Sequence, residues 1–535
     1  MATYKLNSLG VMIDMSRNAV MSLEGLRRFL PILKKMGYNT VLLYTEDTYE
    51  VDGEPYFGYM RGRYSKEEMK SIDAFAASIG ITVIPCIQTL AHLNATLRWG
   101  KIPVDCNDIL LVDDERTYEL IEHMLATLSS CFSSRKIHIG MDEAHMLGRG
   151  RHLDLHGYES VDAIMKRHLA RVCEIAEKYG YEPLMWSDPF FSPWNNGNYY
   201  IPKTEIPKEY IEALPRSVTP VYWDYYKSNE ESYSDMMENH RQLSKKTWFA
   251  GGAWTWMGFA PHNRFTLTAM LPALDAAKKH RVRDIFMTMW GDNGAECSRF
   301  ALLPSLFYLA QYAKGITDES VIKKKFARMF SLSFDDFMKL DQSNNITGNE
   351  QTGHPKNPSK YMLYADPFNG FLDRTVAEGG AAVYASHARE LAALAKKSRK
   401  YGYLFDTQAK LCDVLSLKYD LGVRTRRAYQ NGDKEALLRL ANEDYPEIVK
   451  RIGVFARAFE KQWFAENKTS GFDVQDLRLG GLMQRLTSCK RRLIAYAKGE
   501  ISRIEELECE VLPFGAEGES IAFNSNRLAA STNVH

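Results

Sequence analysis

Two adjacent carboxylic acids, Asp142 and Glu143, are well suited to acid–base chemistry. They end the run KIHIGMDE (136–143), which reads as a buried strand. Glycosidases use two carboxyl groups on opposite sides of the scissile bond, one as general acid and one as nucleophile or base. Neighbouring residues at one strand end can hardly reach both sides of a sugar. If Glu143 is the acid, a 2-acetamido group of the substrate can supply the nucleophile while Asp142 holds that group.

Other predicted strands also end in polar or aromatic residues. These residues are Arg17 after the first strand, His92 after the third, Trp186 at the fifth, Tyr225 at the sixth, Trp254 and Trp256 at the seventh, and Trp290 and Asp292 at the eighth. Indole rings stack on sugar faces, while carboxylates and arginine bind hydroxyl groups. A sugar-binding cleft is therefore expected. Trp254 and Trp256 share one face of the predicted strand, and since only its end reaches the cleft, either can belong to the core.

Eight β-rich runs alternate with amphipathic helical segments over residues 1–315. The runs are 9–15, 39–46, 81–88, 136–143, 182–188, 219–226, 247–256 and 284–292. This alternation predicts an α/β fold with a parallel sheet, and eight units favour a (β/α)8 TIM barrel. A doubly wound open sheet is the alternative. No glycine-rich phosphate loop follows the first strand, which weakens the nucleotide-binding form of that alternative.

Residues 316–535 are expected to form a mostly α-helical C-terminal domain, because long amphipathic segments dominate there. The polar tail after Ile501 is expected to be partly disordered, ending in STNVH. The apolar faces of the predicted helices fit two arrangements, a cap over the cleft or a homodimer interface. A loop-rich segment at 341–370 separates the shorter helices from the longer ones.

Composition excludes several classes of function. Lys plus Arg (68) and Asp plus Glu (67) nearly cancel, which gives no electrostatic reason to expect nucleic acid or an acidic membrane as partner. No apolar run approaches the roughly 20 residues of a membrane helix, and the N-terminus shows no secretory signal. The eight scattered cysteines are expected to be reduced thiols in a cytoplasmic protein. No cofactor is implied.

Three motifs resemble glycoside hydrolase family 20. HIGMDE (138–143) is similar to its H-x-G-G-D-E signature, GVMIDMSR (10–17) to its opening strand G-x-M-L-D-x-[SA]-R, and WGDN (290–293) stands where the family usually has W-x-E. Met141 replaces the second glycine, and Asp292 replaces a longer glutamate. The first strand begins near the N-terminus, which resembles a compact, intracellular branch lacking the accessory α/β domain.

The resemblance implies a retaining β-N-acetylhexosaminidase that acts through an oxazolinium ion on terminal β-linked GlcNAc or GalNAc. By position, Glu143 would be the general acid and base, Asp142 would orient the acetamido N–H, and Tyr225 would donate to the acetamido oxygen. The expected sugar-binding residues are Arg17, His92, Trp186, Trp254 or Trp256, Trp290 and Asp292. Preference between GlcNAc and GalNAc stays open.

Two other functions compete with this expectation. A catalytically silent sugar-binding protein can use the same barrel, and a related glycosidase can act on a different sugar. The intact acidic pair and Tyr225 favour the enzyme, since a lectin needs no general acid. A metal site formed by His138, Asp142, Glu143 and His145 is disfavoured, because such spacings converge on a helix and this segment reads as a strand.

Overall fold

The computed structural model of the protein describes residues 4–346, 354–514 and 516–522. Eight parallel strands close into a barrel in chain order, with β1 paired to both β2 and β8. The strands are β1 (Ser8–Asp14), β2 (Thr40–Tyr44), β3 (Thr82–Cys86), β4 (Lys136–His138), β5 (Glu182–Trp186), β6 (Thr219–Trp223), β7 (Trp248–Gly252) and β8 (Asp284–Met289). The predicted (β/α)8 barrel is confirmed, and the pairing of β1 with β8 excludes the open sheet.

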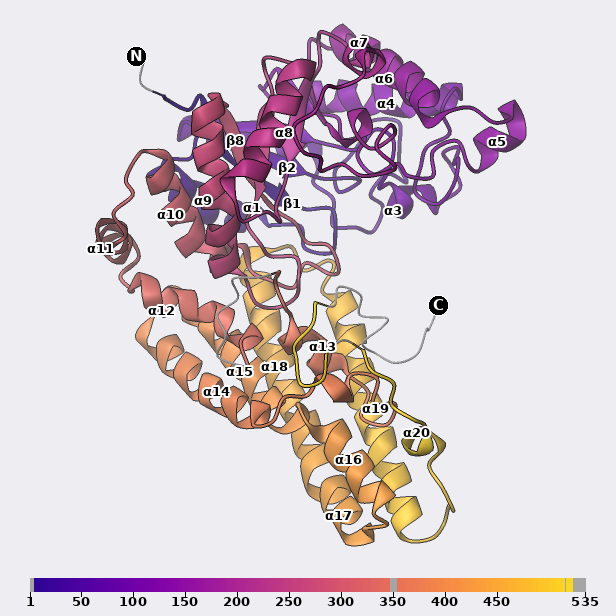
Figure 1. The fold of residues 1–535 in the computed structure, drawn as a ribbon, viewed down its shortest axis with the longest axis vertical. Helices are drawn as coiled ribbons and strands as arrows, with labels where there is room; N and C mark the ends of the chain where they lie inside the picture. Colours follow the sequence, from indigo (N-terminus) through magenta and orange to yellow (C-terminus); the bar gives the residue numbers. More distant parts are fainter. Residues whose placement is uncertain (1–3, 347–353, 515, 523–535) are drawn as a thin grey trace.

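Helices follow each strand and cover the outside of the barrel (Figure 1). They are α1 (Leu23–Met36), α2 (Lys66–Ser78), α3 (Asn94–Leu97), α4 (Glu115–Ser129), α5 (Arg151–His156), α6 (Val161–Lys178), α7 (Lys208–Ala213), α8 (Glu230–Leu243), α9 (Asn263–His280) and α10 (Leu303–Ala313). Local sequence sets their ends. The Ser22 side chain accepts a hydrogen bond from the Gly25 amide at the start of α1, and Gly37 ends this helix with a φ of 115°, in the left-handed region.

Alternate strand residues divide between two parts of the core, as a period of two requires. One buried cluster fills the barrel and includes Met12, Leu42, Ile84, Leu184, Trp186, Trp248 and Phe286. Their strand neighbours pack in a second cluster with the surrounding helices, and these include Val11, Val41, Val83 and Ile285. The barrel interior is thus a packed core, and a binding site must lie at the strand ends.

Several predicted strands extend too far along the chain. The runs 136–143, 219–226, 247–256 and 284–292 end as strands at His138, Trp223, Gly252 and Met289. The loops that follow are themselves apolar and partly buried, so hydrophobicity does not mark where hydrogen bonding between strands stops. The predicted site residues consequently lie at or just beyond the strand ends.

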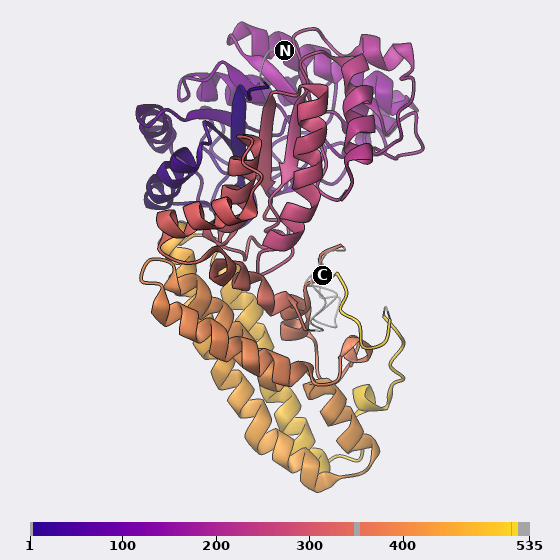
Figure 2. The ribbon, with the colours of Figure 1, turned by 60° about the vertical axis from the view of Figure 1, so that its left-hand side comes forward.

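A mostly helical region follows the barrel, as predicted, and makes the molecule elongated (Figures 1 and 2). Its helices are α11 (Glu319–Phe330), α12 (Phe334–Met338), α13 (Pro358–Tyr364), α14 (Gly380–Lys397), α15 (Gly402–Lys418), α16 (Leu421–Gln430), α17 (Lys434–Arg439), α18 (Tyr445–Glu466), α19 (Asp473–Ala497) and α20 (Glu505–Glu508). The domain division between residues 315 and 316 stays a prediction. The terminal STNVH lies outside the described residues. Among the helices that are described, none has both the length and the hydropathy needed to cross a membrane.

The helical region packs against loops at the C-terminal face of the barrel. The Lys468 amide donates to the Val20 carbonyl at 2.8 Å, after β1. Gln408 Nε2 donates to the Phe259 carbonyl at 2.7 Å, after β7. Gln475 Nε2 donates to the Gly294 carbonyl at 3.1 Å, after β8. Lys468 Nζ also donates to the Arg63 carbonyl at 3.0 Å, after β2. The helical region therefore supports the loops after β1, β2, β7 and β8.

Candidate active site

A cleft lies at the C-terminal ends of the strands, and every strand contributes to it. Its volume is about 130 Å³, which is small beside the roughly 300–1,000 Å³ of most ligand pockets. It is lined by Arg17 after β1, Tyr44 at the end of β2, His92 after β3, Asp142 and Glu143 after β4, Trp186 at the end of β5, Trp223, Tyr225 and Tyr226 at β6, Trp256 after β7, and Trp290 and Asp292 after β8.

Asp142 and Glu143 lie on an irregular turn beyond β4. Gly140, Met141 and Glu143 have φ values of 73°, 71° and 52°, all in the left-handed region. A Cβ on Gly140 would lie 2.1 Å from Oε1 of Gln88, so only glycine fits there. The left-handed residues on both sides of Asp142 break the two-residue alternation of a strand. The directions of the two carboxyl groups therefore follow from this turn.

Asp142 is held in its ionised form by two neighbours. Its Oδ1 accepts a hydrogen bond from Gln88 Nε2 at 2.7 Å, and its Oδ2 lies 3.3 Å from Nε2 of His92. Burial raises the pKa of Asp142, but His92 and the Gln88 amide outweigh this effect and hold it below its usual value. Burial lowers the pKa of His92, but Asp142 outweighs it and brings the value to about 9. At neutral pH this contact is an ion pair.

Glu143 has the opposite electrostatic environment. Partial burial and the negative charge of Asp142 raise its pKa, against the opposing effect of His92. Its side chain is 48% exposed in the cleft, with Oε2 3.9 Å from His92 Nε2. Its backbone amide donates to Oδ2 of Asp188 at 3.0 Å. When the pKa of one carboxyl group is raised and that of its neighbour is lowered, the first can act as an acid while the second stays ionised.

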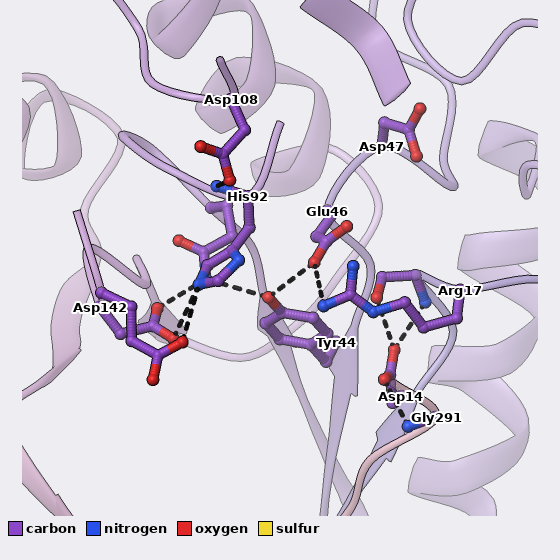
Figure 3. Close-up of polar contacts among 12 residues, drawn as sticks. Asp14, Arg17, Tyr44, Glu46, Asp47, His92, Asp108, Asp142 and Gly291 are labelled. Carbon is purple, nitrogen blue, oxygen red and sulfur yellow. Dashed lines mark hydrogen bonds and ion pairs between the residues drawn. The ribbon is translucent and has the colours of Figure 1, made fainter. Parts of the chain in front are cut away.

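A chain of polar contacts connects Asp142 to Arg17 (Figure 3). Gln88 Nε2 donates to the Tyr44 hydroxyl, which donates to Oε1 of Glu46, both at 3.0 Å. The same Glu46 oxygen lies 3.3 Å from Nη2 of Arg17. Burial raises the pKa of Glu46 to about 7, although Arg17 and His92 counteract it. Within the part of the chain that the structure describes, the buried Nε of Arg17 has no hydrogen-bond partner.

Asp14 joins the loops after β1 and β8. Its Oδ2 accepts the Gly291 amide at 2.7 Å and its Oδ1 accepts the Ser16 amide at 2.8 Å (Figure 3). These bonds bring Arg17 and Asp292 to one side of the cleft. Desolvation by the surrounding side chains raises the pKa of Asp292 to about 6, and the charge of Arg17 opposes this effect. Asp292 is nevertheless exposed at the cleft.

Aromatic rings form the opposite wall. Tyr225 stacks on Trp223 with ring centroids 5.5 Å apart, and Trp256 stacks on Trp254 at 4.2 Å. Trp254 is fully buried behind the cleft, and its Nε1 donates to the Tyr225 carbonyl at 3.1 Å. Burial raises the pKa of Tyr225 well above its usual value, which keeps its hydroxyl protonated. Nε1 of buried Trp186 has no hydrogen-bond partner among the described residues.

Comparison with known families gives two matches that together cover most of the chain. Residues 1–238 match "Glycosyl hydrolase family 20, catalytic domain", and residues 335–524 match "Glycoside Hydrolase 20C C-terminal domain". The chain belongs to glycoside hydrolase family 20. The motifs around residues 10–17 and 138–143 lie inside the first match.

Individual relatives are distant. The chain is 24% identical to human (Homo sapiens) hexosaminidase D over 217 residues, which are 37% of this chain and 41% of the relative. It is 24% identical to bovine (Bos taurus) hexosaminidase D over 213 residues, 37% of this chain and 58% of the relative. The matches thus span about half the length of these relatives. The solved family 20 exo-β-N-acetylglucosaminidase of Vibrio harveyi, in complex with N-acetylglucosamine, has a TM-score of 0.47 and 16% identity, over 63% of this chain and 59% of that chain. The Streptomyces plicatus N-acetyl-β-hexosaminidase in complex with Thio-NAglucal has a TM-score of 0.47 and 18% identity, over 63% and 70%.

All the residues that the sequence assigned to this family 20 site line the cleft, except Trp254. The roles of the individual residues stay predictions. The predicted placement of Trp254 and Trp256 on one strand was wrong, because β7 ends at Gly252 and neither tryptophan belongs to it. Instead, Trp256 faces the cleft and Trp254 supports it from behind.

Sequence reasoning missed four residues of the site. Tyr44, Trp223 and Tyr226 line the cleft, and Gln88 binds Asp142. Tyr44 and Trp223 are the last residues of β2 and β6, so an accurate strand end would have identified them. Gln88 closes the apolar run ITVIPCIQ, and a polar residue at the end of a buried strand is a usable signal.

The acidic pair also belongs to a group with the geometry of a metal site. Ligand atoms of His92, Asp142 and Glu143 all lie within 4.8 Å of one another. The alternative set proposed from sequence required His138 and His145, and neither belongs to this group. With its pKa raised to about 9, His92 would have to release a proton at neutral pH before it could bind a metal ion.

Proposed function

We propose that the protein is an exo-acting β-N-acetylhexosaminidase that hydrolyses terminal β-linked GlcNAc or GalNAc with retention of configuration. The observation that carries this proposal is the pair Asp142–Glu143, adjacent in the chain, with the pKa of one lowered and the other raised. No separate carboxylate is required as nucleophile if the substrate provides one, as in the substrate-assisted glycosidases of family 20.

In the first step, the carboxyl proton of Glu143 moves to the glycosidic oxygen while the bond from C1 to that oxygen breaks. The acetamido carbonyl oxygen attacks C1 and forms an oxazolinium ion. The Asp142 carboxylate accepts the acetamido N–H and stabilises the positive charge that develops. The Tyr225 hydroxyl donates to the acetamido oxygen and orients it.

In the second step, the Glu143 carboxylate takes a proton from water, and the water oxygen adds to C1 on the face that the leaving group vacated. The bond from C1 to the acetamido oxygen breaks, which restores the acetamide and gives a product of retained configuration. His92 holds Asp142 ionised through both steps. Each step needs only the substrate, water and two carboxyl groups, so the proposal includes no cofactor.

The cleft also supports binding of a single terminal sugar. Arg17 and Asp292 lie on the side suited to the 3-, 4- and 6-hydroxyl groups. Trp186, Trp256 and Trp290 supply aromatic faces for the acetamido methyl group and the pyranose ring. The small volume, about 130 Å³, favours removal of one sugar at a time.

We also propose a cytoplasmic location and a homodimer. All eight cysteines are free, and six of them are buried, which fits a reducing compartment. Light scattering on the purified protein measures the oligomeric state directly.

Hydrolysis of 4-nitrophenyl glycosides tests the proposed activity. The wild type should release 4-nitrophenol from the β-GlcNAc or β-GalNAc derivative but not from the β-glucoside, which lacks the acetamido group. Glu143→Gln should reduce kcat by about 10²- to 10⁴-fold, the usual contribution of a general acid. Glu209→Gln, at an exposed glutamate of α7, is the matched control and should keep full activity.

Two other outcomes would redirect the assignment. Turnover of the β-glucoside would mean that the enzyme has its own nucleophile, and the role given to Asp142 would be wrong. Binding of N-acetylglucosamine without turnover of any glycoside would favour the catalytically silent sugar-binding protein.

A further inference from the structure

A second cavity lies beside the catalytic cleft. It has a volume of about 350 Å³ and lies between the loops after β4 and β5 and helices α6 and α7. Figure 1 shows these two helices at the top of the view, and a hydrogen bond from the Tyr210 hydroxyl to Oδ2 of Asp162 joins them at 2.6 Å. Glu143 lines both this cavity and the cleft. The side chain expected to protonate the leaving group therefore marks where the two spaces meet.

We propose that this cavity binds the aglycone of the substrate, and that the aglycone it favours is apolar. The inference rests on the proposed function. A general acid donates its proton to the glycosidic oxygen, so the aglycone must begin beside that acid and extend away from the sugar pocket. The cavity that shares Glu143 with the cleft meets this requirement.

The walls of the cavity are largely apolar. Met165 and Phe190 are buried beneath it, and the rings of Tyr158 and Tyr210 flank it. Tyr158 is 74% exposed, an unusual position for a large aromatic ring, and the Arg149 guanidinium lies 4.8 Å from its centroid. These surfaces would gain from covering by an alkyl or aryl group.

Several polar groups of the cavity are already engaged within the protein. Both oxygens of Asp188 accept N–H groups, one from the Glu143 backbone and one from the Trp223 indole. Arg149 donates to the Glu159 carbonyl at 3.3 Å. A second sugar would need many free donors and acceptors, whereas an apolar aglycone needs few. His145 and Lys166 also line the cavity, but its walls are mostly apolar, and an apolar group is therefore assigned as the occupant rather than another sugar.

Two β-N-acetylglucosaminides with aglycones of equal length test this assignment. One carries an octyl chain and the other a 2-(2-ethoxyethoxy)ethyl chain, which replaces two methylene groups with ether oxygens. The wild type should hydrolyse the octyl glycoside with a kcat/KM about tenfold higher, since burial of two methylene groups corresponds to roughly that factor. The ether aglycone is the better leaving group, so chemistry alone would favour the opposite order.

Variants of the cavity wall locate the effect. Tyr158→Ala/Tyr210→Ala removes two rings that are not buried, and Met165→Gln makes the wall polar at nearly equal volume. Both should reduce the octyl preference below about threefold while leaving hydrolysis of the ether glycoside nearly unchanged. Tyr56→Ala is the matched control, because this tyrosine is 44% exposed and belongs to a different cavity; the preference should persist in it.

Each contrary result overturns the assignment. Equal kcat/KM for the two glycosides in the wild type means that no apolar aglycone site exists. A preference that survives both cavity variants, or disappears in Tyr56→Ala, means that the aglycone binds elsewhere. If neither these glycosides nor the 4-nitrophenyl derivatives are hydrolysed, the proposed function fails and the aglycone site fails with it.

Discussion

Gln88→Met tests the electrostatic control of Asp142 most directly. Gln88 is fully buried, and its Nε2 donates to Oδ1 of Asp142 at 2.7 Å. Methionine keeps the length of the side chain and removes the donor. A hydrogen bond to a charged group contributes about 1.5–3 kcal/mol, and one pKa unit corresponds to about 1.4 kcal/mol. Because the lost bond favours the ionised form, the pKa of Asp142 should rise by about one to two units.

The pH dependence of kcat/KM for 4-nitrophenyl β-N-acetylglucosaminide measures this shift. The profile reports ionisations of the free enzyme, and the proposed mechanism requires Asp142 ionised and Glu143 protonated. The acidic limb should therefore move to higher pH by about one to two units in Gln88→Met. The variant should also unfold at lower urea concentration, because the Met141 amide loses its acceptor, Oε1 of Gln88.

Gln408→Met separates the electrostatic effect from the loss of stability. Gln408 is a buried glutamine of α15 whose Nε2 donates to the Phe259 carbonyl and whose Oε1 accepts from Ser343. This variant should lose stability and keep the wild-type acidic limb. If Gln88→Met is folded and its acidic limb coincides with that of the wild type, Asp142 is not the group whose ionisation limits activity.

Three further predictions concern the acetamido-binding tyrosine, a buried ion pair of the helical region and the pH dependence of stability. Tyr225→Phe should lower kcat on the acetamido substrates by about 10²- to 10³-fold, as removal of a single oriented donor does, with an unchanged thermal midpoint. Lys360 forms a buried ion pair with Glu296. Lys360→Met should reduce the free energy of unfolding in urea by about 3 kcal/mol, the low end for breaking a buried pair, because Arg478 still contacts Glu296 at 3.0 Å. Lys360→Met/Glu296→Leu should recover part of the loss, and no recovery would contradict this account. The pKa of His92 is raised from 6.5 to about 9. The stability of the folded protein that is linked to this shift is present below pH 6.5 and lost as pH rises through 9. The free energy of unfolding of the wild type should therefore fall by on the order of 3 kcal/mol over that range. His92→Gln should not show this loss, and parallel pH curves for the two proteins would refute the shift.

The barrel could be predicted because its signals are local. Each strand is a short apolar run, and each major helix has an apolar face that repeats within a few residues. Helix ends also follow from nearby residues, as with Ser22 before α1 and Gly37 after it. The site residues followed because the barrel gathers the loops after its strands at one face, where all of the predicted residues except Trp254 line the cleft.

The contacts that tune the site could not be predicted, because they join residues far apart in the sequence. Gln88 and Asp142 are 54 residues apart, and Asp14 and Gly291 are 277 apart. The contribution of the helical region was also hidden. Its Lys360 forms a buried ion pair with Glu296 at 2.7 Å and donates to the Asn293 carbonyl at 3.1 Å. No pattern with a period of two or 3.6 residues reports such pairs.

The turn at Met141 shows how this chain accommodates a methionine where the family motif has glycine. Met141 replaces a glycine of the motif and has a φ of 71°, which costs a residue with a Cβ about 1–2 kcal/mol. Its side chain is fully buried, and burial of a methionine contributes about 1.5–3 kcal/mol. The Oε1 atom of Gln88 accepts its amide, and Asp188 accepts the amide of Glu143, which is also left-handed. Packing and two hydrogen bonds thus offset the backbone strain. The turn that orients the Asp142 and Glu143 side chains therefore does not require glycine at position 141.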